Sequence, residues 1–251
     1  MTNKNIMLFF GFLFLVSLCY ALPVNNGLLA YYNFNASIAD LSGNNASTTV
    51  VGNAAIQSTA GYSSTGGLVL DGSGDHVKVY LPLNANTGGS NTVNFWMKWG
   101  GGNWEMPVGF SNYDLWIADG GFGFNSNQGD VFGISSSGLA NTWVYVSAVF
   151  YNGAPSSSTH KLYINGVLQN LSYYRGSSSV SWPTTDYFYM GTYGYSTTAH
   201  DFQGSLDEFA VYNRELNSTE VSQLYNSYIP EPSSILMLCI AIAIGFFRIR
   251  K

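Results

Sequence analysis

Paired carboxylates are one arrangement that could do acid–base chemistry, but the sequence contains no E-x-D-x-x-E run, and Asp207 and Glu208 are directly adjacent. A retaining glycosidase needs two carboxyl groups about 5 to 5.5 Å apart. Residues next to each other on a strand point to opposite faces, so we do not expect this pair to meet. The histidines lack the spacing of a metal site, and the sequence contains no G-x-S-x-G motif. We therefore predict that the protein is not an enzyme.

Aromatic side chains are the second group that could bind a ligand. Flat rings with polar tips stack well against the faces of sugars. Five such residues lie in Gly- and Ser-rich surroundings where loops are expected, and these candidate ligand-binding residues are Tyr173, Tyr174, Trp182, Tyr193 and Tyr195. The alternative is that the rings pack in the core or pair across strands, as most aromatic residues of β-proteins do.

The composition is typical of a β-rich extracellular protein. Only 9% of the 251 residues are charged, compared with about 25% in an ordinary soluble domain. Between Leu22 and Tyr228, thirteen acidic residues outnumber five basic ones, which gives this segment a net charge of −8. Because no basic patch is available to neutralise phosphates, we predict that nucleic acid is not a partner.

The first 21 residues have the features of a secretory signal peptide. One early positive charge is followed by an apolar run from Ile6 to Leu18. Small residues at Cys19 and Ala21 then predict cleavage after Ala21. The second cysteine, Cys239, lies near the other end of the chain, so we expect no disulfide in the domain between them.

Residues 229–251 contain three parts in a fixed order. A Pro-Glu-Pro motif comes first, then an apolar run at about 235–247, then a basic end; the named residues are Pro230, Glu231, Pro232, Arg248, Arg250 and Lys251. This order resembles a PEP-CTERM sorting signal, which implies an exosortase-type membrane protease as a partner. The run is short for a membrane-spanning helix, and the basic end should stay in the cytoplasm. A tail anchor without processing is the alternative.

The residues between the two ends predict many short strands and one helix. Trp143 to Tyr151 is apolar on both alternating faces, as in a central strand that is covered on both sides. Asn165-Gly166 predicts a tight hairpin, and residues 71–75 predict a turn between two strands. Asn217 to Glu220 forms a near capping box before apolar residues at helical spacing. We therefore predict one all-β sandwich or jelly roll over residues 22–228, with one short C-terminal helix.

Several of these segments resemble the LamG-like family. WVYVSAV at 143–149 and KLYING at 161–166 resemble its central pair of strands. FQGSLDEFAVYNREL at 202–216 resembles its last strand, and ADLSGN at 39–44 and LDG at 70–72 are similar to its early segments. The resemblance implies a concanavalin A-like jelly-roll β-sandwich. It leaves the ligand open, because one fold carries many functions.

The resemblance also implies a structural calcium ion. In related domains an Asp of the early loop and the Asp of the last strand can meet at calcium. The matching residues here are Asp40, with Asn44 nearby, and Asp207. The alternative is that Asp40 caps a turn and that Asp207 accepts backbone hydrogen bonds.

The function predicted from all these segments is non-catalytic binding outside the cell. We expect an exported protein of the cell surface or extracellular matrix, transiently anchored in the inner membrane by its C-terminal helix. It would bind a polysaccharide or a surface protein in association with exopolysaccharide. Two alternatives stay open: a structural matrix component without a discrete ligand site, and a glycan-active hydrolase.

Overall fold

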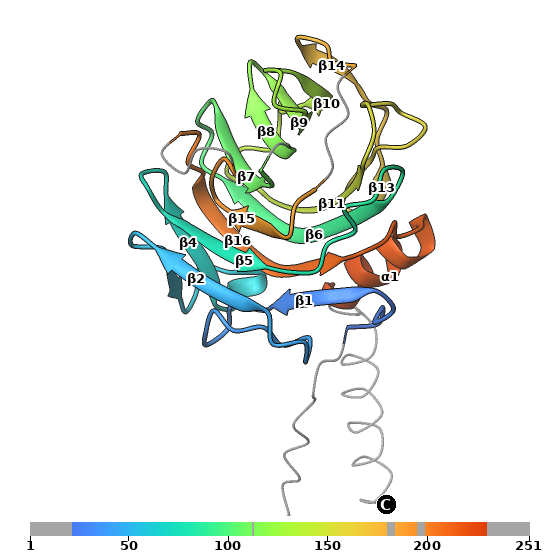
Figure 1. Ribbon diagram of the computed structural model, residues 1–251. Helices are drawn as coiled ribbons and strands as arrows, with labels where there is room; N and C mark the ends of the chain where they lie inside the picture. Colours follow the sequence, from blue (N-terminus) through green and yellow to red (C-terminus); the bar gives the residue numbers. More distant parts are fainter. Residues whose placement is uncertain (1–21, 112, 180–183, 195–198, 230–251) are drawn as a thin grey trace, which may run out of the picture.

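Two sheets packed face to face make up the folded part of the chain (Figure 1). The computed structural model describes residues 22–111, 113–179, 184–194 and 199–229. The predicted signal peptide, the predicted Pro-Glu-Pro motif at 230–232 and the predicted membrane helix at 235–247 lie outside these residues. Within the described part of the chain, no helix has the length and apolar character needed to cross a membrane.

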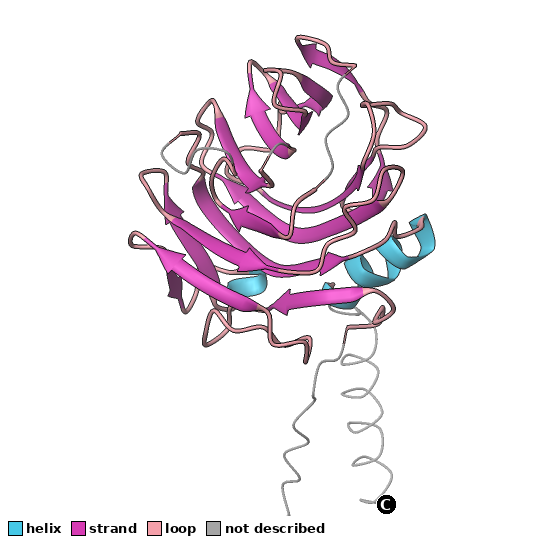
Figure 2. Cartoon of the chain, viewed as in Figure 1, coloured by secondary structure: helices cyan, strands magenta, loops and turns pink. Residues whose placement is uncertain are grey.

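Each sheet contains eight antiparallel strands. Across the first sheet they are β13 (Val167–Leu168), β12 (Lys161–Ile164), β11 (Trp143–Tyr151), β6 (Ser90–Trp99), β16 (Gln203–Tyr212), β4 (Gly67–Asp71) and β3 (Ala55–Gln57), with β1 (Leu28–Tyr32) also paired to β16. Across the second they are β14 (Ser172–Arg175), β10 (Val131–Ser135), β9 (Gly121–Asn125), β8 (Asp114–Ala118), β7 (Glu105–Gly109), β15 (Tyr187–Met190), β5 (His76–Tyr80) and β2 (Ser47–Val51). The helix α1 (Ser218–Tyr228) and a 3-10 turn, η1 (Tyr62–Ser64), complete the described fold, which confirms the predicted all-β sandwich with one short late helix (Figure 2).

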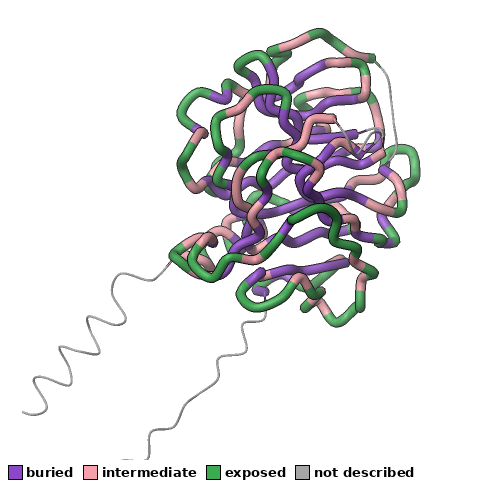
Figure 3. The backbone as a smooth tube through the Cα atoms, turned by 90° about the vertical axis from the view of Figure 1, so that its left-hand side faces the viewer, coloured by how far each residue is buried: buried purple, intermediate pink, exposed green. Residues whose placement is uncertain are grey.

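Aromatic rings from both layers fill the space between the sheets. Phe209 of β16 stacks on Phe95 of β6, with 5.1 Å between ring centroids. It also stacks on Phe188 of β15, in the other sheet, at 5.5 Å. All three side chains are fully buried, and the buried stretches in Figure 3 run through the middle of the domain. Removing such large rings from water supplies much of the free energy that holds the two sheets together.

The outer face of the first sheet also carries apolar side chains, and α1 packs against them. Trp96, Tyr145 and Tyr212 belong to one buried cluster with Val221 and Leu224 of the helix. The burial pattern of β11 confirms the prediction of a central strand covered on both sides, since only its two end residues are partly exposed.

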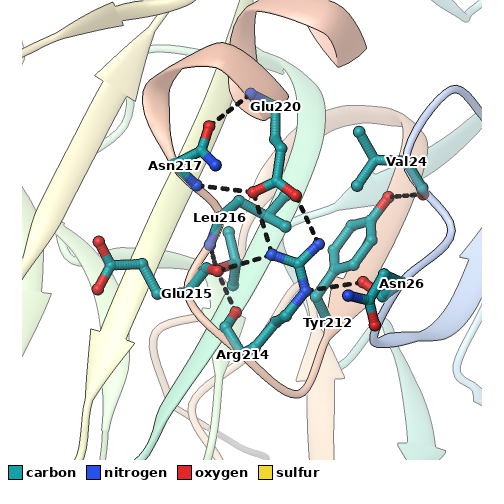
Figure 4. A network of polar contacts seen from close by, with 9 residues as sticks. Val24, Asn26, Tyr212, Arg214, Glu215, Leu216, Asn217 and Glu220 are labelled. Carbon is teal, nitrogen blue, oxygen red and sulfur yellow. Dashed lines mark hydrogen bonds and ion pairs between the residues drawn. The ribbon is translucent and has the colours of Figure 1, made fainter.

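A capping box fixes the start of α1 (Figure 4). The side-chain oxygen of Asn217 accepts a hydrogen bond from the Glu220 N–H at 3.0 Å, and the Glu220 carboxylate accepts one from the Asn217 N–H at 2.9 Å. Arg214 donates two hydrogen bonds to the same carboxylate, at 2.7 and 3.0 Å, and a third to the Asn26 carbonyl at 2.8 Å. The helix start is therefore joined both to the segment that follows the last strand and to the N-terminal segment of the domain.

Replacing Asn217 by alanine is expected to destabilise the domain by about 1 kcal/mol, because an N–H of the first helical turn loses its acceptor. For a domain of this size the melting temperature should fall by roughly 2 to 4 °C. Thermal unfolding followed by circular dichroism measures the change. Gln223→Ala, at an exposed position of the same helix, is the matched control. Equal melting temperatures for the two variants would contradict this role of the cap.

Two turns that the local sequence predicts are present in the structure. Asn165 and Gly166, with φ of 52° and 77°, join β12 to β13 as the predicted hairpin. The turn predicted at 71–75 also exists, but it connects β4 of the first sheet to β5 of the second. The local signal therefore predicted the turn without predicting that the chain changes sheets there.

Candidate functional site

A cavity of about 600 Å³ lies on the outer face of the first sheet, beside the end of α1. Three tyrosines and two carboxylates dominate its lining, namely Tyr31, Tyr62, Tyr228, Asp207 and Glu208. They come from β1, η1, the last turn of α1 and β16. None of the described residues that line the cavity is Lys, Arg or His. The site is therefore aromatic and acidic.

A β-bulge in β16 brings the two carboxylates into this cavity together. Asp207 pairs with Trp96 of β6, and pairing resumes between Ala210 and Asn94, so two residues of β16 face one residue of β6 in this interval. Glu208, inside the bulge, has a φ of 50°. The prediction that the adjacent carboxylates point to opposite faces is wrong, because it assumed a regular strand.

Asp207 ties η1 to the last strand. Its side chain is fully buried. One carboxylate oxygen accepts hydrogen bonds from the Tyr62 N–H at 2.9 Å and from the Thr65 hydroxyl at 3.1 Å, and the other accepts the Glu208 N–H at 2.8 Å. Burial raises the pKa of Asp207 to about 7, and the three hydrogen bonds oppose the rise only in part.

Glu208 is the more accessible of the two acids. The Tyr31 hydroxyl donates a hydrogen bond to Oε2 of its carboxylate. The other oxygen, Oε1, accepts no hydrogen bond from the described residues. Burial raises the pKa of Glu208 to about 7, and the negative charge of Asp207 adds to the rise. Two acids that titrate near neutral pH in one cavity are typical of a functional site.

The ring of Tyr62 supplies a flat surface beside the acids. It stacks on Trp96 with 3.5 Å between ring centroids and 7° between the planes. Trp143 packs against it edge-on at 6.4 Å. These contacts fix the orientation of the ring, while Tyr62 stays partly exposed where it lines the cavity.

The aromatic residues predicted to bind a ligand lie elsewhere. Tyr173 and Tyr174 are on β14, at the edge of the second sheet, where they are 37% and 43% exposed. Tyr193 packs on a small apolar cluster of the second sheet. Trp182 and Tyr195 lie outside the described residues. None of the three described tyrosines lines the cavity.

The tyrosines that do line the cavity were missed by sequence reasoning. Tyr31 lies in an apolar strand and Tyr228 at the end of a helix, so both look like ordinary core residues. Tyr62 lies in a segment rich in Gly, Ser and Thr, which is the same signal that selected the other candidates. That signal could have identified Tyr62.

Asp40 is engaged within its own loop. Its carboxylate accepts hydrogen bonds from the N–H groups of Tyr31, Ser42 and Ala46 at 3.0, 2.9 and 2.9 Å. The Ser42 hydroxyl adds a fourth at 2.8 Å. Two donors on each oxygen use the lone pairs that a cation would need. The structure thus supports the alternative in which Asp40 caps a turn.

The three residues predicted to share a calcium ion do not form one site in the structure. Asn44 turns its amide nitrogen to the Leu28 carbonyl at 2.9 Å, and Asp40 lies outside the lining of the cavity that contains Asp207. Within the described ranges, no three His, Cys, Asp or Glu side chains group closely enough to hold a metal ion. Calcium binding stays a prediction, which melting temperatures in calcium and in chelator would test.

Solved structures with a similar fold include botulinum neurotoxin domains. The serotype D binding domain has a TM-score of 0.59 at 18% identity, and the receptor binding domain of the C/D mosaic serotype has 0.58 at 18%. A serotype D ligand binding domain in complex with N-acetylneuraminic acid has 0.57 at 19%. Each match covers 81% of this chain and 52% of the other, so the chain spans about half the length of these structures. At this identity the likeness shows the fold alone.

Sequence comparison gives the family. No curated protein matches the chain. A family model described as the concanavalin A-like lectin/glucanases superfamily matches residues 71–222, which run from the end of β4 into α1. Since this match covers more than half of the 251 residues, the chain belongs to the concanavalin A-like lectin/glucanases superfamily.

Proposed function

We propose that the protein is a non-catalytic carbohydrate-binding module and that the cavity beside α1 is its sugar site. The observation that carries the proposal is the Tyr62 ring, held flat on Trp96 next to the carboxylates of Asp207 and Glu208. A fixed aromatic face suits stacking against a sugar ring. Carboxylates and amides beside such a face can accept and donate hydrogen bonds to sugar hydroxyls.

Relatives of known structure support a sugar as the ligand. One serotype D ligand binding domain of this fold was solved in complex with N-acetylneuraminic acid. That ligand belongs to a protein of which this chain spans about half, at 19% identity. It supports carbohydrate as a ligand class for the fold, and the choice of sugar depends on the residues of this cavity.

Replacing Tyr62 by alanine is expected to weaken polysaccharide binding about tenfold or more, because the stacking surface is removed. Affinity gel electrophoresis against a panel of soluble polysaccharides measures the change. Tyr174→Ala, which removes an exposed ring outside the cavity, is the matched control and should bind like the wild type. If only Tyr174→Ala lost binding, the ligand surface would lie on β14 instead.

A glycan-active hydrolase is the second candidate, and the paired carboxylates of Asp207 and Glu208 are the observation that favours it. Two acids with a pKa near neutrality could divide the roles of proton donor and nucleophile. The binding proposal expects no release of reducing sugar from any polysaccharide that the protein retains. Release that disappears in Glu208→Gln would replace binding by catalysis as the function.

Export to the cell surface or extracellular matrix completes the proposal. The sequence of residues 230–251 supports processing by an exosortase-type protease, which would remove the basic end and Cys239. Mass spectrometry of the exported protein is expected to find a C-terminus close to Pro230–Ser233. An intact end at Lys251, in a host with a working exosortase, would leave only a plain membrane anchor.

A further inference from the structure

The charged side chains among the described residues that line the sugar cavity are all negative. Asp207 and Glu208 are its charged groups among the described lining residues. The ion pairs formed within the described domain use other acids, namely Glu215, Asp119 and Glu220. The two carboxylates of the cavity therefore have no cationic partner from the described part of the chain.

Two carboxylates that are largely removed from water, without a counter-charge, are costly to keep ionised. Burial raises the pKa of both acids to about 7, and no neighbouring cation lowers either value. The other titratable groups that line the cavity are the phenols of Tyr31, Tyr62 and Tyr228, which are neutral when protonated. A positively charged ligand group would offset this cost directly.

The cavity also contains polar atoms that lack partners. Oε1 of Glu208 accepts no hydrogen bond from the described residues. The Tyr228 hydroxyl is buried and has no well-formed hydrogen bond to any side chain or backbone group of the described residues. Glu208 is moreover held at a φ of 50°, a strained conformation of the kind that gathers at ligand sites. Of these two atoms, Oε1 of the partly exposed Glu208 is the one available to a ligand that enters the cavity.

We propose that this cavity selects sugars that carry a free amino group, with the ammonium paired to Glu208 and the sugar ring stacked on Tyr62. The proposal rests on the sugar-binding function proposed above. A charge-assisted hydrogen bond to the carboxylate and the nearby aromatic faces both favour a cation. The side-chain amide of Asn33 and the hydroxyl of Ser63 also line the cavity and remain for the neutral hydroxyls of the same sugar.

Acidic sugars are disfavoured by the same charges. A ligand carboxylate would face two protein carboxylates within a domain segment of net charge −8. N-acetylneuraminic acid, the ligand of the similar serotype D domain, carries such a group. On this proposal the two proteins would bind sugars of opposite charge in spite of their similar folds.

Isothermal titration calorimetry with the full chain tests the proposal at pH 7. The probes are a glucosamine tetrasaccharide, its fully N-acetylated counterpart and N-acetylneuraminic acid. We expect the free amine form to bind at least about tenfold more tightly than the acetylated form, and the acidic sugar not to bind measurably. Added salt should reduce the preference, since charge pairing carries it.

Glu208→Gln is the decisive variant, because it removes the charge and keeps the shape. The preference for the amine should vanish, because the neutral amide of the variant cannot form a charge-assisted pair with the ammonium. Glu215→Gln, an exposed acid paired with Lys161 outside the cavity, should keep the preference. The melting temperature of each variant confirms that it folds.

The outcomes separate the two proposals. Equal affinity for the two tetrasaccharides, or tighter binding of the acidic sugar, would overturn the selection for amines and leave sugar binding in place. Absence of binding to all three probes and to the polysaccharide panel would overturn both. A preference that survives in Glu208→Gln would show that the amine does not pair with this carboxylate.

Discussion

The wild-type domain is expected to lose stability as the pH rises from 5 to 8, relative to the double variant Asp207→Asn/Glu208→Gln. Both acids have a pKa of about 7 in the folded state, above the values of about 4 for unfolded chains. Between these values the folded protein binds more protons than the unfolded one, so stability falls as the pH rises through the folded pKa. The loss is on the order of 5 kcal/mol for the pair, or roughly 10 to 20 °C in melting temperature.

The comparison with the double variant is needed because His160 changes the stability of the domain with pH in the opposite direction. Burial lowers the pKa of His160 to about 4, so the unfolded state binds more protons below about pH 6.5 and stability falls on acidification. His160 contributes equally to wild type and variant, and the difference between their melting curves isolates the acid pair. Parallel melting temperatures from pH 5 to pH 8 would mean that the two carboxylates titrate as ordinary exposed acids.

Much of the fold could be predicted because its signals are local. The apolar faces of β11, the Asn165-Gly166 hairpin and the capping box of α1 each depend on residues close in sequence. The strands β9 and β10 lacked such a signal, since their glycines interrupt the alternation of side chains. Their existence depends on pairing with each other and with β8 and β14, which no local pattern specifies.

The candidate site was harder to predict because long-range register creates it. Asp207 was identified through its position in the last strand, but its partnership with Glu208 requires the bulge against β6. The Tyr62 ring gains its role from Trp96, 34 positions later in the sequence, in a different element. Tyr173 and Tyr174 were expected in a loop, but they lie on the edge strand β14, where exposed rings do not make a cavity.

Replacing Gly61 by alanine is expected to damage this site more than any single change of a lining residue. Gly61 has no unusual backbone angle; the reason is space, because an added Cβ would lie 2.1 Å from the Gly66 carbonyl oxygen and 2.6 Å from a carboxylate oxygen of Asp207. The turn must then move away from the last strand. Movement breaks the hydrogen bonds from Tyr62 and Thr65 to Asp207 and leaves a buried carboxylate short of donors, at a cost of about 2 to 3 kcal/mol.

Thr65→Val provides the graded comparison, since it removes only one of those hydrogen bonds and nearly preserves the shape. We expect Gly61→Ala to lower the melting temperature by roughly 4 to 10 °C and Thr65→Val by roughly half of that. Polysaccharide binding should also fall in Gly61→Ala, because the Tyr62 ring moves with the turn, and should survive in Thr65→Val. A Gly61→Ala protein that melts and binds like the wild type would show that the turn can move without cost, and that the close approach of Gly61 to Asp207 does not position the ring.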